Sequence, residues 1–128
     1  MRLLLDTHIA LWAIIDSPKL PAKARELILD PTSELFVSAV TVWEIAIKHA
    51  TGRSNMPVSG AEAYRFFLAS GYQLLPITHL HAIVTESLPR HHNDPFDRLL
   101  VAQAQTEPLK FVTRDALLAR YGDAVLLV

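Results

Sequence analysis

The chain has 128 residues, 51% of them hydrophobic, and a formal net charge of -1 at pH 7. This length and apolar share suit one domain with a single core, so we expect one domain over residues 1–128. The near-neutral charge excludes a strongly basic nucleic-acid-binding protein, and the absence of cysteine excludes disulfides and thiolate metal sites.

The chain begins with a short apolar run, Leu3 to Leu5, that ends at Asp6. Unbroken apolar runs are typical of strands buried on both faces of a parallel sheet, so Asp6 is predicted at the carboxyl end of the first strand. The apolar stretch from His8 to Ile15 precedes a second helix, Ala22 to Leu29. No run is long enough to span a bilayer, and Asp6 and His8 interrupt any signal-peptide pattern. We therefore expect a cytoplasmic protein without membrane contact.

The middle of the chain continues the alternation of strands and helices. Residues 35–37 form the second predicted strand. Apolar residues then recur at helical spacing through a segment that contains Glu44 and stops at Thr51 and Gly52. Further predicted elements are a loop over 55–60, a helix over 61–69, a strand over 72–77 and a helix over 78–87.

Asp94 and Pro95 mark the start of a later helix, because aspartate is a favoured helix cap and proline a favoured first residue. This helix is predicted to run to about Thr106, after a loop over 89–93. The remaining predicted elements are a strand over 109–113, a short helix over 115–121 and a last strand over 124–128. Such alternation predicts an α/β protein with a mostly parallel sheet and a ligand crevice beyond the carboxyl ends of its strands.

Four acidic residues, Asp6, Glu44, Asp97 and Asp115, are the candidate site, although each has a structural alternative. Asp6 follows a buried strand, where an unpaired charge is costly, but it could simply cap the next helix. Glu44 lies among apolar residues, but it could be an exposed glutamate paired with Lys48. Asp115 follows the fourth predicted strand and could be another helix cap.

Asp94 and Asp97 are three residues apart and resemble a capping box. Asp94 is better explained as a plain cap, whereas Asp97 could direct its carboxylate toward a cation. We therefore take Asp97 as a site residue and Asp94 as a supporting one.

Several of these acids follow strands, so they are predicted to meet at one edge of the sheet. Carboxylates in close contact raise one another's pKa unless a cation neutralises them, and a set of oxygen ligands selects Mg²⁺ or Mn²⁺. Such an ion can activate water against a phosphodiester without a protein nucleophile. The aromatic residues Trp12 and Trp43 are predicted to belong to the core or a dimer surface. The loop residues His91 and His92 could contact RNA or orient the site, but loop histidines without a role are the favoured interpretation.

Four segments in series carry a resemblance to a known family: residues 3–8 (Leu-Leu-Leu-Asp-Thr-His), 38–48, 92–104 with Asp-Pro-Phe-Asp, and 112–115. Together they resemble a PIN domain, and more narrowly the toxin of a VapBC toxin–antitoxin pair. The resemblance covers nearly the whole chain and implies a three-layer α/β/α sandwich.

The resemblance also implies a function. Asp6, Glu44, Asp97 and Asp115 would bind Mg²⁺ or Mn²⁺ and cleave RNA, with Thr7 and Ser38 as small polar residues around the site. Asp94 is the second choice for the third acid. The expected partners are an RNA substrate, a second copy of the chain in a homodimer, and a VapB-type antitoxin whose tail enters the active-site groove.

Two other classes of function remain open from the sequence. One is a non-catalytic PIN-like module that binds RNA or protein. The other is a small phosphatase or flap-type DNA nuclease that uses the same acids, although Thr7 and His8 stand where an aspartyl-phosphate enzyme would need a second aspartate.

Overall fold

The structure, a computed structural model, describes residues 1–128 and centres on a five-stranded sheet of order β3-β2-β1-β4-β5. Every neighbouring pair of strands is parallel, so all the carboxyl ends lie at one edge. The predicted α/β architecture is confirmed, and the sheet is parallel throughout. The strands are β1 (Arg2–Leu5), β2 (Glu34–Ser38), β3 (Gln73–Leu75), β4 (Lys110–Thr113) and β5 (Val125–Leu127).

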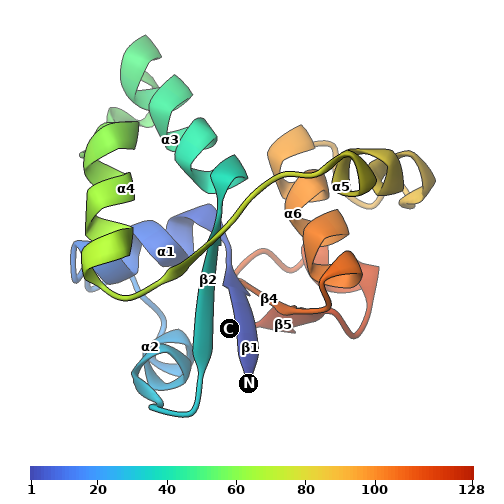
Figure 1. Ribbon diagram of the computed structural model, residues 1–128, viewed down its shortest axis with the longest axis horizontal. Helices are drawn as coiled ribbons and strands as arrows, with labels where there is room; N and C mark the ends of the chain where they lie inside the picture. Colours follow the sequence, from blue (N-terminus) through green and yellow to red (C-terminus); the bar gives the residue numbers. More distant parts are fainter.

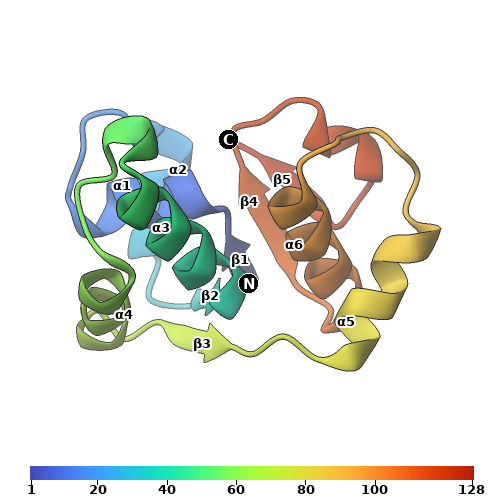
Figure 2. The ribbon, with the colours of Figure 1, turned by 90° about the horizontal axis from the view of Figure 1, so that it is seen from above.

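Helices cover both faces of the sheet, which gives the expected three layers (Figure 1). Successive residues of a strand point to opposite faces, and β1 shows this directly: Leu3 and Leu5 pack in one core, Leu4 in the other. Helix α3 packs against α4 and also contacts α6, and Figure 2 shows α4 and α5 on opposite sides of the molecule. The helices are α1 (Thr7–Ile14), α2 (Ala22–Leu29) and α4 (Gly60–Ala69) on one side, α5 (His79–Val84) and α6 (Pro95–Thr106) on the other, and α3 (Ala39–Thr51), which leaves the carboxyl end of β2.

The direction of α3 matters because this helix carries Glu44. It ends at Gly52 in a left-handed conformation, φ 68°, as the sequence predicted. Its packing on α4 is close: a Cβ atom added to Gly60 would lie 2.8 Å from the Cβ of Ala46. Glycine at position 60 therefore allows α3 and α4 to pack closely, and this packing helps to fix the direction of α3 over the sheet.

Three predicted elements differ from the structure. The strand expected over 72–77 is only Gln73–Leu75, because Pro76 lacks the N–H needed to continue the ladder. The helix expected over 78–87 ends at Val84 and continues as a 3₁₀ turn, η2 (Thr85–Ser87). The helix expected over 115–121 is a turn followed by a 3₁₀ helix, η3 (Leu118–Tyr121), and another 3₁₀ turn, η1 (Arg53–Asn55), follows α3. None of the helices combines the length and hydropathy that a membrane crossing requires.

Candidate active site

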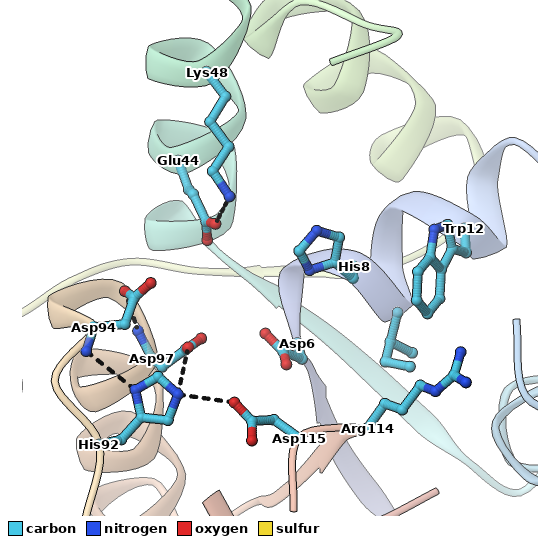
Figure 3. A pocket seen from close by; sticks show the side chains of 11 residues that line it. Asp6, His8, Trp12, Glu44, Lys48, His92, Asp94, Asp97, Arg114 and Asp115 are labelled. Carbon is cyan, nitrogen blue, oxygen red and sulfur yellow. Dashed lines mark hydrogen bonds and ion pairs between the residues drawn. The ribbon is translucent and has the colours of Figure 1, made fainter. Parts of the chain in front are cut away.

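A cavity of about 440 Å³ opens beyond the carboxyl ends of the central strands (Figure 3). All four predicted site acids line it, together with the supporting residue Asp94. The expected convergence at one edge of the sheet is therefore present in the geometry. The complete lining is Asp6, His8, Ile9, Trp12, Glu44, Lys48, His92, Asp94, Asp97, Arg114 and Asp115.

Asp6 is both a helix cap and a member of this cavity. It stands directly after β1 and caps α1, where its Oδ1 accepts a hydrogen bond from the Thr7 N–H at 2.7 Å. Its Oδ2 accepts from the Thr113 hydroxyl of β4 at 2.7 Å. Burial raises the pKa of the Asp6 carboxyl, against the opposing effect of these two hydrogen bonds. The two readings of Asp6 are thus compatible.

Glu44 is buried, with only 4% of its surface exposed. The alternative of an exposed glutamate is therefore wrong, although the pairing with Lys48 is present at 2.6 Å. The other oxygen of Glu44 accepts from the Thr7 hydroxyl at 2.7 Å, and Thr7 lies 3.1 Å from the Thr41 hydroxyl. Because Thr7 has one hydroxyl proton, Thr41 must donate to Thr7. Both oxygens of Glu44 thus have polar partners although the side chain is buried.

Asp94 and Asp97 have different roles at the start of α6. Asp94 caps the helix by accepting from the N–H groups of Phe96 at 2.8 Å and Asp97 at 3.3 Å. The capping box is not closed, because the Asp94 N–H donates to His92 Nδ1 at 3.1 Å and not to Asp97. The carboxylate of Asp97 is consequently free to point into the cavity (Figure 3).

The electrostatics of the cavity are strongest at Asp97. Burial raises the pKa of the Asp97 carboxyl to about 8, and repulsion from Asp6, Asp94, Glu44 and Asp115 adds to the effect in that order. A carboxyl with this pKa is largely protonated at neutral pH unless a cation is close. The cluster therefore has the electrostatic character of a cation-binding site.

Asp115 follows β4 and is fixed from three sides. Its N–H donates to the Thr113 hydroxyl at 3.1 Å, and its Oδ1 accepts from the Leu117 N–H at 2.9 Å. Its Oδ2 accepts from His92 Nε2 at 2.8 Å. The cap-like bond to Leu117 closes a turn, and the second oxygen remains directed toward the cavity.

His92 lines the cavity, so the favoured prediction of a loop histidine without a role is wrong, and the alternative that it orients the site fits the structure. Its Nδ1 accepts from the Asp94 N–H, so in the neutral ring the proton is on Nε2. That Nε2–H faces Asp115 Oδ2 at 2.8 Å and Asp97 Oδ2 at 3.5 Å. In this arrangement His92 donates to Asp115 and faces Asp97, so it can hold both carboxylates in a fixed orientation, as histidines that hydrogen-bond to metal ligands do. The sequence feature that favoured a role for His92 was its position two residues before Asp94, the cap of α6.

The loop that carries His92 is clamped by α6 and η3. Tyr121 accepts from the His92 N–H at 3.2 Å and donates to the Pro89 carbonyl at 2.7 Å. Arg98 donates to the Tyr121 hydroxyl at 3.1 Å and to the Thr85 carbonyl at 3.0 Å. These contacts hold the imidazole in place through the fold and not through sequence neighbours.

The two small polar residues expected near the site behave differently. Thr7 binds Glu44 directly, as described above. Ser38 does not line the cavity: it caps α3 through the Val40 N–H at 3.0 Å and donates to Gln103 Oε1 at 2.5 Å. Ser38 thus ties α3 to α6 and fixes the relative positions of the two helices that carry Glu44 and Asp97.

The donor set fits a divalent cation. Side-chain atoms of His92, Asp97 and Asp115 lie within 4.8 Å of one another, and Asp6 and Glu44 line the same cavity. With both ring nitrogens of His92 engaged in hydrogen bonds, the ligands available to a cation are the carboxylates. Carboxylate oxygens are the ligands that Mg²⁺ and Mn²⁺ prefer. Fold and cavity together define an α/β protein with a carboxylate cluster at the carboxyl edge of a parallel sheet.

This chain belongs to the PIN domain family, whose model matches residues 3–124. PIN domains are generally nucleases, and they typically use divalent metals. No curated protein sequence matches the chain.

Several solved structures share the fold. The crystal structure of VapBC2 from Rickettsia felis bound to promoter DNA aligns with a TM-score of 0.71 at 16% identity, over 100% of this chain and 98% of that one. FitAcB from Neisseria gonorrhoeae aligns with a TM-score of 0.63 at 19% identity, over 98% and 96%. VapBC-1 from nontypeable Haemophilus influenzae aligns with a TM-score of 0.60 at 19% identity, over 94% and 92%.

Proposed function

We propose that this protein is a Mg²⁺- or Mn²⁺-dependent endoribonuclease that acts as the toxin of a type II toxin–antitoxin pair. The observation that carries the proposal is the gathering of five carboxylates in one cavity, with the pKa of Asp97 raised to about 8. Membership of the PIN family supports a nuclease. The similarity of the fold to toxin–antitoxin structures supports the toxin role.

In this proposal Asp6, Glu44, Asp97 and Asp115 hold the cation, which would polarise a phosphodiester and supply the attacking water. His92 keeps Asp115 and Asp97 oriented through its Nε2–H. The hydroxyls of Thr7 and Thr113 donate to Glu44 and Asp6, so both are engaged as hydrogen-bond donors. Hydrolysis by water, without a covalent enzyme intermediate, follows from this arrangement.

Lys48 has a definite place in the same scheme. Its ammonium group pairs with Glu44 at 2.6 Å and lines the cavity. When a cation binds Glu44, the two positive charges repel, and Lys48 becomes available for a phosphate oxygen of the substrate. We therefore assign to Lys48 a contact with the substrate backbone.

The experiment that tests the function is cleavage of end-labelled single-stranded RNA and of DNA of the same sequence, with Mg²⁺, Mn²⁺ or EDTA. We expect internal cuts in RNA with either metal and none with EDTA, because the carboxylates alone repel the phosphate. Calorimetric titration with Mn²⁺ accompanies the assay. Absence of saturable Mn²⁺ binding and of cleavage would leave a PIN-like binding module in place of an enzyme.

We further propose that the protein forms a homodimer through the side of the sheet where β3 is the edge strand and that a VapB-type antitoxin holds it inactive. Large apolar side chains are exposed on the helices that flank β3, namely Tyr64 and Leu68 on α4 and Leu80 and Ile83 on α5. Exposed apolar patches of this kind mark protein contacts.

The dimer is tested by light scattering on the purified chain. We expect a mass near twice 14.3 kDa, and a return to the monomer mass in an Ile83→Glu variant, because a buried unpaired charge opposes association. The matched control is Gln105→Glu, which places the same charge at an exposed position on α6. A monomeric wild-type protein at high concentration would contradict the homodimer. Coexpression with the adjacent reading frame tests the antitoxin, which should co-purify and suppress cleavage.

A further inference from the structure

One wall of the cavity contains no acid. It is formed by His8 and Trp12 of α1 and by Arg114, which follows β4, and it lies across from His92 (Figure 3). We propose that this wall is a subsite for a single-stranded nucleotide next to the scissile phosphate, with the base on Trp12 and its phosphate on Arg114. The proposal rests on the proposed nuclease function and names where its substrate is held.

Trp12 provides a fixed aromatic surface. Its side chain is half-buried and packs against the core that contains Leu3 and Ile9, so the indole is anchored while part of it faces the cavity. His8, one helical turn earlier, lies with its ring centroid 5.6 Å from the indole, at 40° between planes. The sequence prediction that Trp12 belongs to the core or a dimer surface is therefore incomplete, because the ring also lines the cavity.

Arg114 is a cation without an acidic partner, and its one contact of this kind is with the Trp12 ring. It precedes Asp115 in the chain, yet its guanidinium points away from the carboxylates and lies 5.9 Å from the Trp12 ring centroid (Figure 3). It makes no hydrogen bond or ion pair within the protein and is exposed. The other cation of the cavity, Lys48, is already paired with Glu44. All the donors of Arg114 thus remain free for a phosphate.

The chemistry of this wall favours an unpaired nucleotide over other occupants. Proteins that bind single strands combine aromatic rings, on which bases stack, with cations that follow the backbone. A polyanionic strand approaching five carboxylates also needs a positive contact on the open side of the cavity. A base-paired strand would not expose a base face to Trp12, so the subsite selects single-stranded or looped RNA.

The first test uses a Trp43→Phe protein, in which Trp12 is the sole tryptophan. A short single-stranded oligoribonucleotide is titrated in Ca²⁺ and checked on a gel for intactness afterwards. We expect quenching of Trp12 fluorescence on binding, and about tenfold weaker binding, by anisotropy of the labelled probe, when Trp12 is changed to Leu in the same background. A Trp12→Tyr variant should retain most of the affinity.

A probe with abasic positions separates the loss of stacking from any effect of the substitution on folding, because it is tested on the Trp43→Phe protein, the reference protein in which Trp12 is intact. The abasic probe should bind about as weakly to the reference protein as it binds to the Trp12→Leu variant. For Arg114→Ala we expect the slope of log affinity against log salt to fall by about 0.7, the loss of one phosphate contact on a single strand. Arg65→Ala, which removes an exposed arginine on α4, is the matched control and should leave the slope unchanged.

The outcomes distinguish this subsite from the function itself. If the reference protein cleaves RNA but the Trp12→Leu and Arg114→Ala variants bind and cleave as it does, the subsite is overturned and the nuclease stands. If the quenching and the slope change are seen without any cleavage, the subsite stands and the nuclease fails. Absence of quenching in a protein that binds the probe also overturns the subsite.

Discussion

Replacing Asp97 with Asn is expected to lower RNA cleavage about a thousandfold or more, with the protein still folded. The reason is the position of Asp97, whose carboxylate points into the cavity next to four other acids and is the one they affect most. Several kcal/mol of transition-state stabilisation come from a correctly held cation, and about 4 kcal/mol corresponds to a thousandfold in rate. Asp6→Asn should have an effect of similar size.

Two further substitutions test whether the loss of activity is specific to Asp97. Asp94→Asn should lose much less activity, because asparagine caps helices as well as aspartate does and Asp94 mainly binds the N–H groups of Phe96 and Asp97. Asp123→Asn removes an exposed acid far from the cavity and should leave cleavage unchanged.

Initial rates in Mg²⁺ and in Mn²⁺ measure these effects, and circular dichroism checks the fold of each variant. Full activity in Asp97→Asn would overturn the assignment of the site. A larger loss in Asp94→Asn than in Asp97→Asn would exchange the roles of the two aspartates, and the helix cap would then be a metal ligand.

The second large effect concerns stability without metal. The pKa of Asp97 is raised from the usual 3.8 to about 8 in the folded protein, so between these values the folded state binds more protons than the unfolded state. The free energy of unfolding therefore falls as pH rises from about 4 to 8, with a limiting slope of about 1 kcal/mol per pH unit. Below this window the group contributes no penalty, and above it the penalty is complete.

Asp97→Asn removes the charge and with it this dependence. We expect the variant without metal to be more stable than the wild type at pH 8 and equal to it near pH 4, by urea unfolding in EDTA. Comparing the two proteins at each pH cancels the contribution of the histidines that do not contact Asp97, which are all of the six except His92. Parallel pH profiles for wild type and variant would contradict the raised pKa.

Metal should reverse the order of the two proteins. A cation that binds the folded state stabilises it by mass action, and it also lets Asp97 ionise without penalty. Mn²⁺ at pH 8 is thus expected to raise the melting temperature of the wild type by several degrees and that of Asp97→Asn by much less. The residue that costs the metal-free protein stability is the one the proposed activity needs, a trade-off found at many functional sites.

Local sequence patterns were enough to locate the acids on their elements. The unbroken apolar run of β1 predicted Asp6 at a strand end, and Asp94 with Pro95 predicted the start of α6, which brings Asp97 into its first turn. These signals depend on residues close in sequence. For the same reason they could not separate a helix cap from a site residue, and at Asp6 both descriptions hold.

The residues whose place at the site sequence reasoning missed or ranked second depend mainly on distant partners. His92 orients Asp115 across 23 positions of sequence, and its tautomer is set by the Asp94 N–H. Trp12 and Arg114 come together only because α1 and the end of β4 border one cavity. A loop histidine or a helical tryptophan has no local pattern that reports such neighbours.

The sequence by itself determined the order and type of the main elements, because hydrophobic periodicity and helix capping act over a few residues. Only the tertiary structure decided which side chains meet. The central place of β1 between β2 and β4 brings Asp6 within hydrogen-bond distance of Thr113, 107 positions away. Packing also buries Glu44, partly buries Asp97 and gathers the acids, so that burial and, second to it, repulsion between like charges raise the pKa of Asp97. Burial and charge repulsion depend on distances in space, and packing of the whole chain sets those distances.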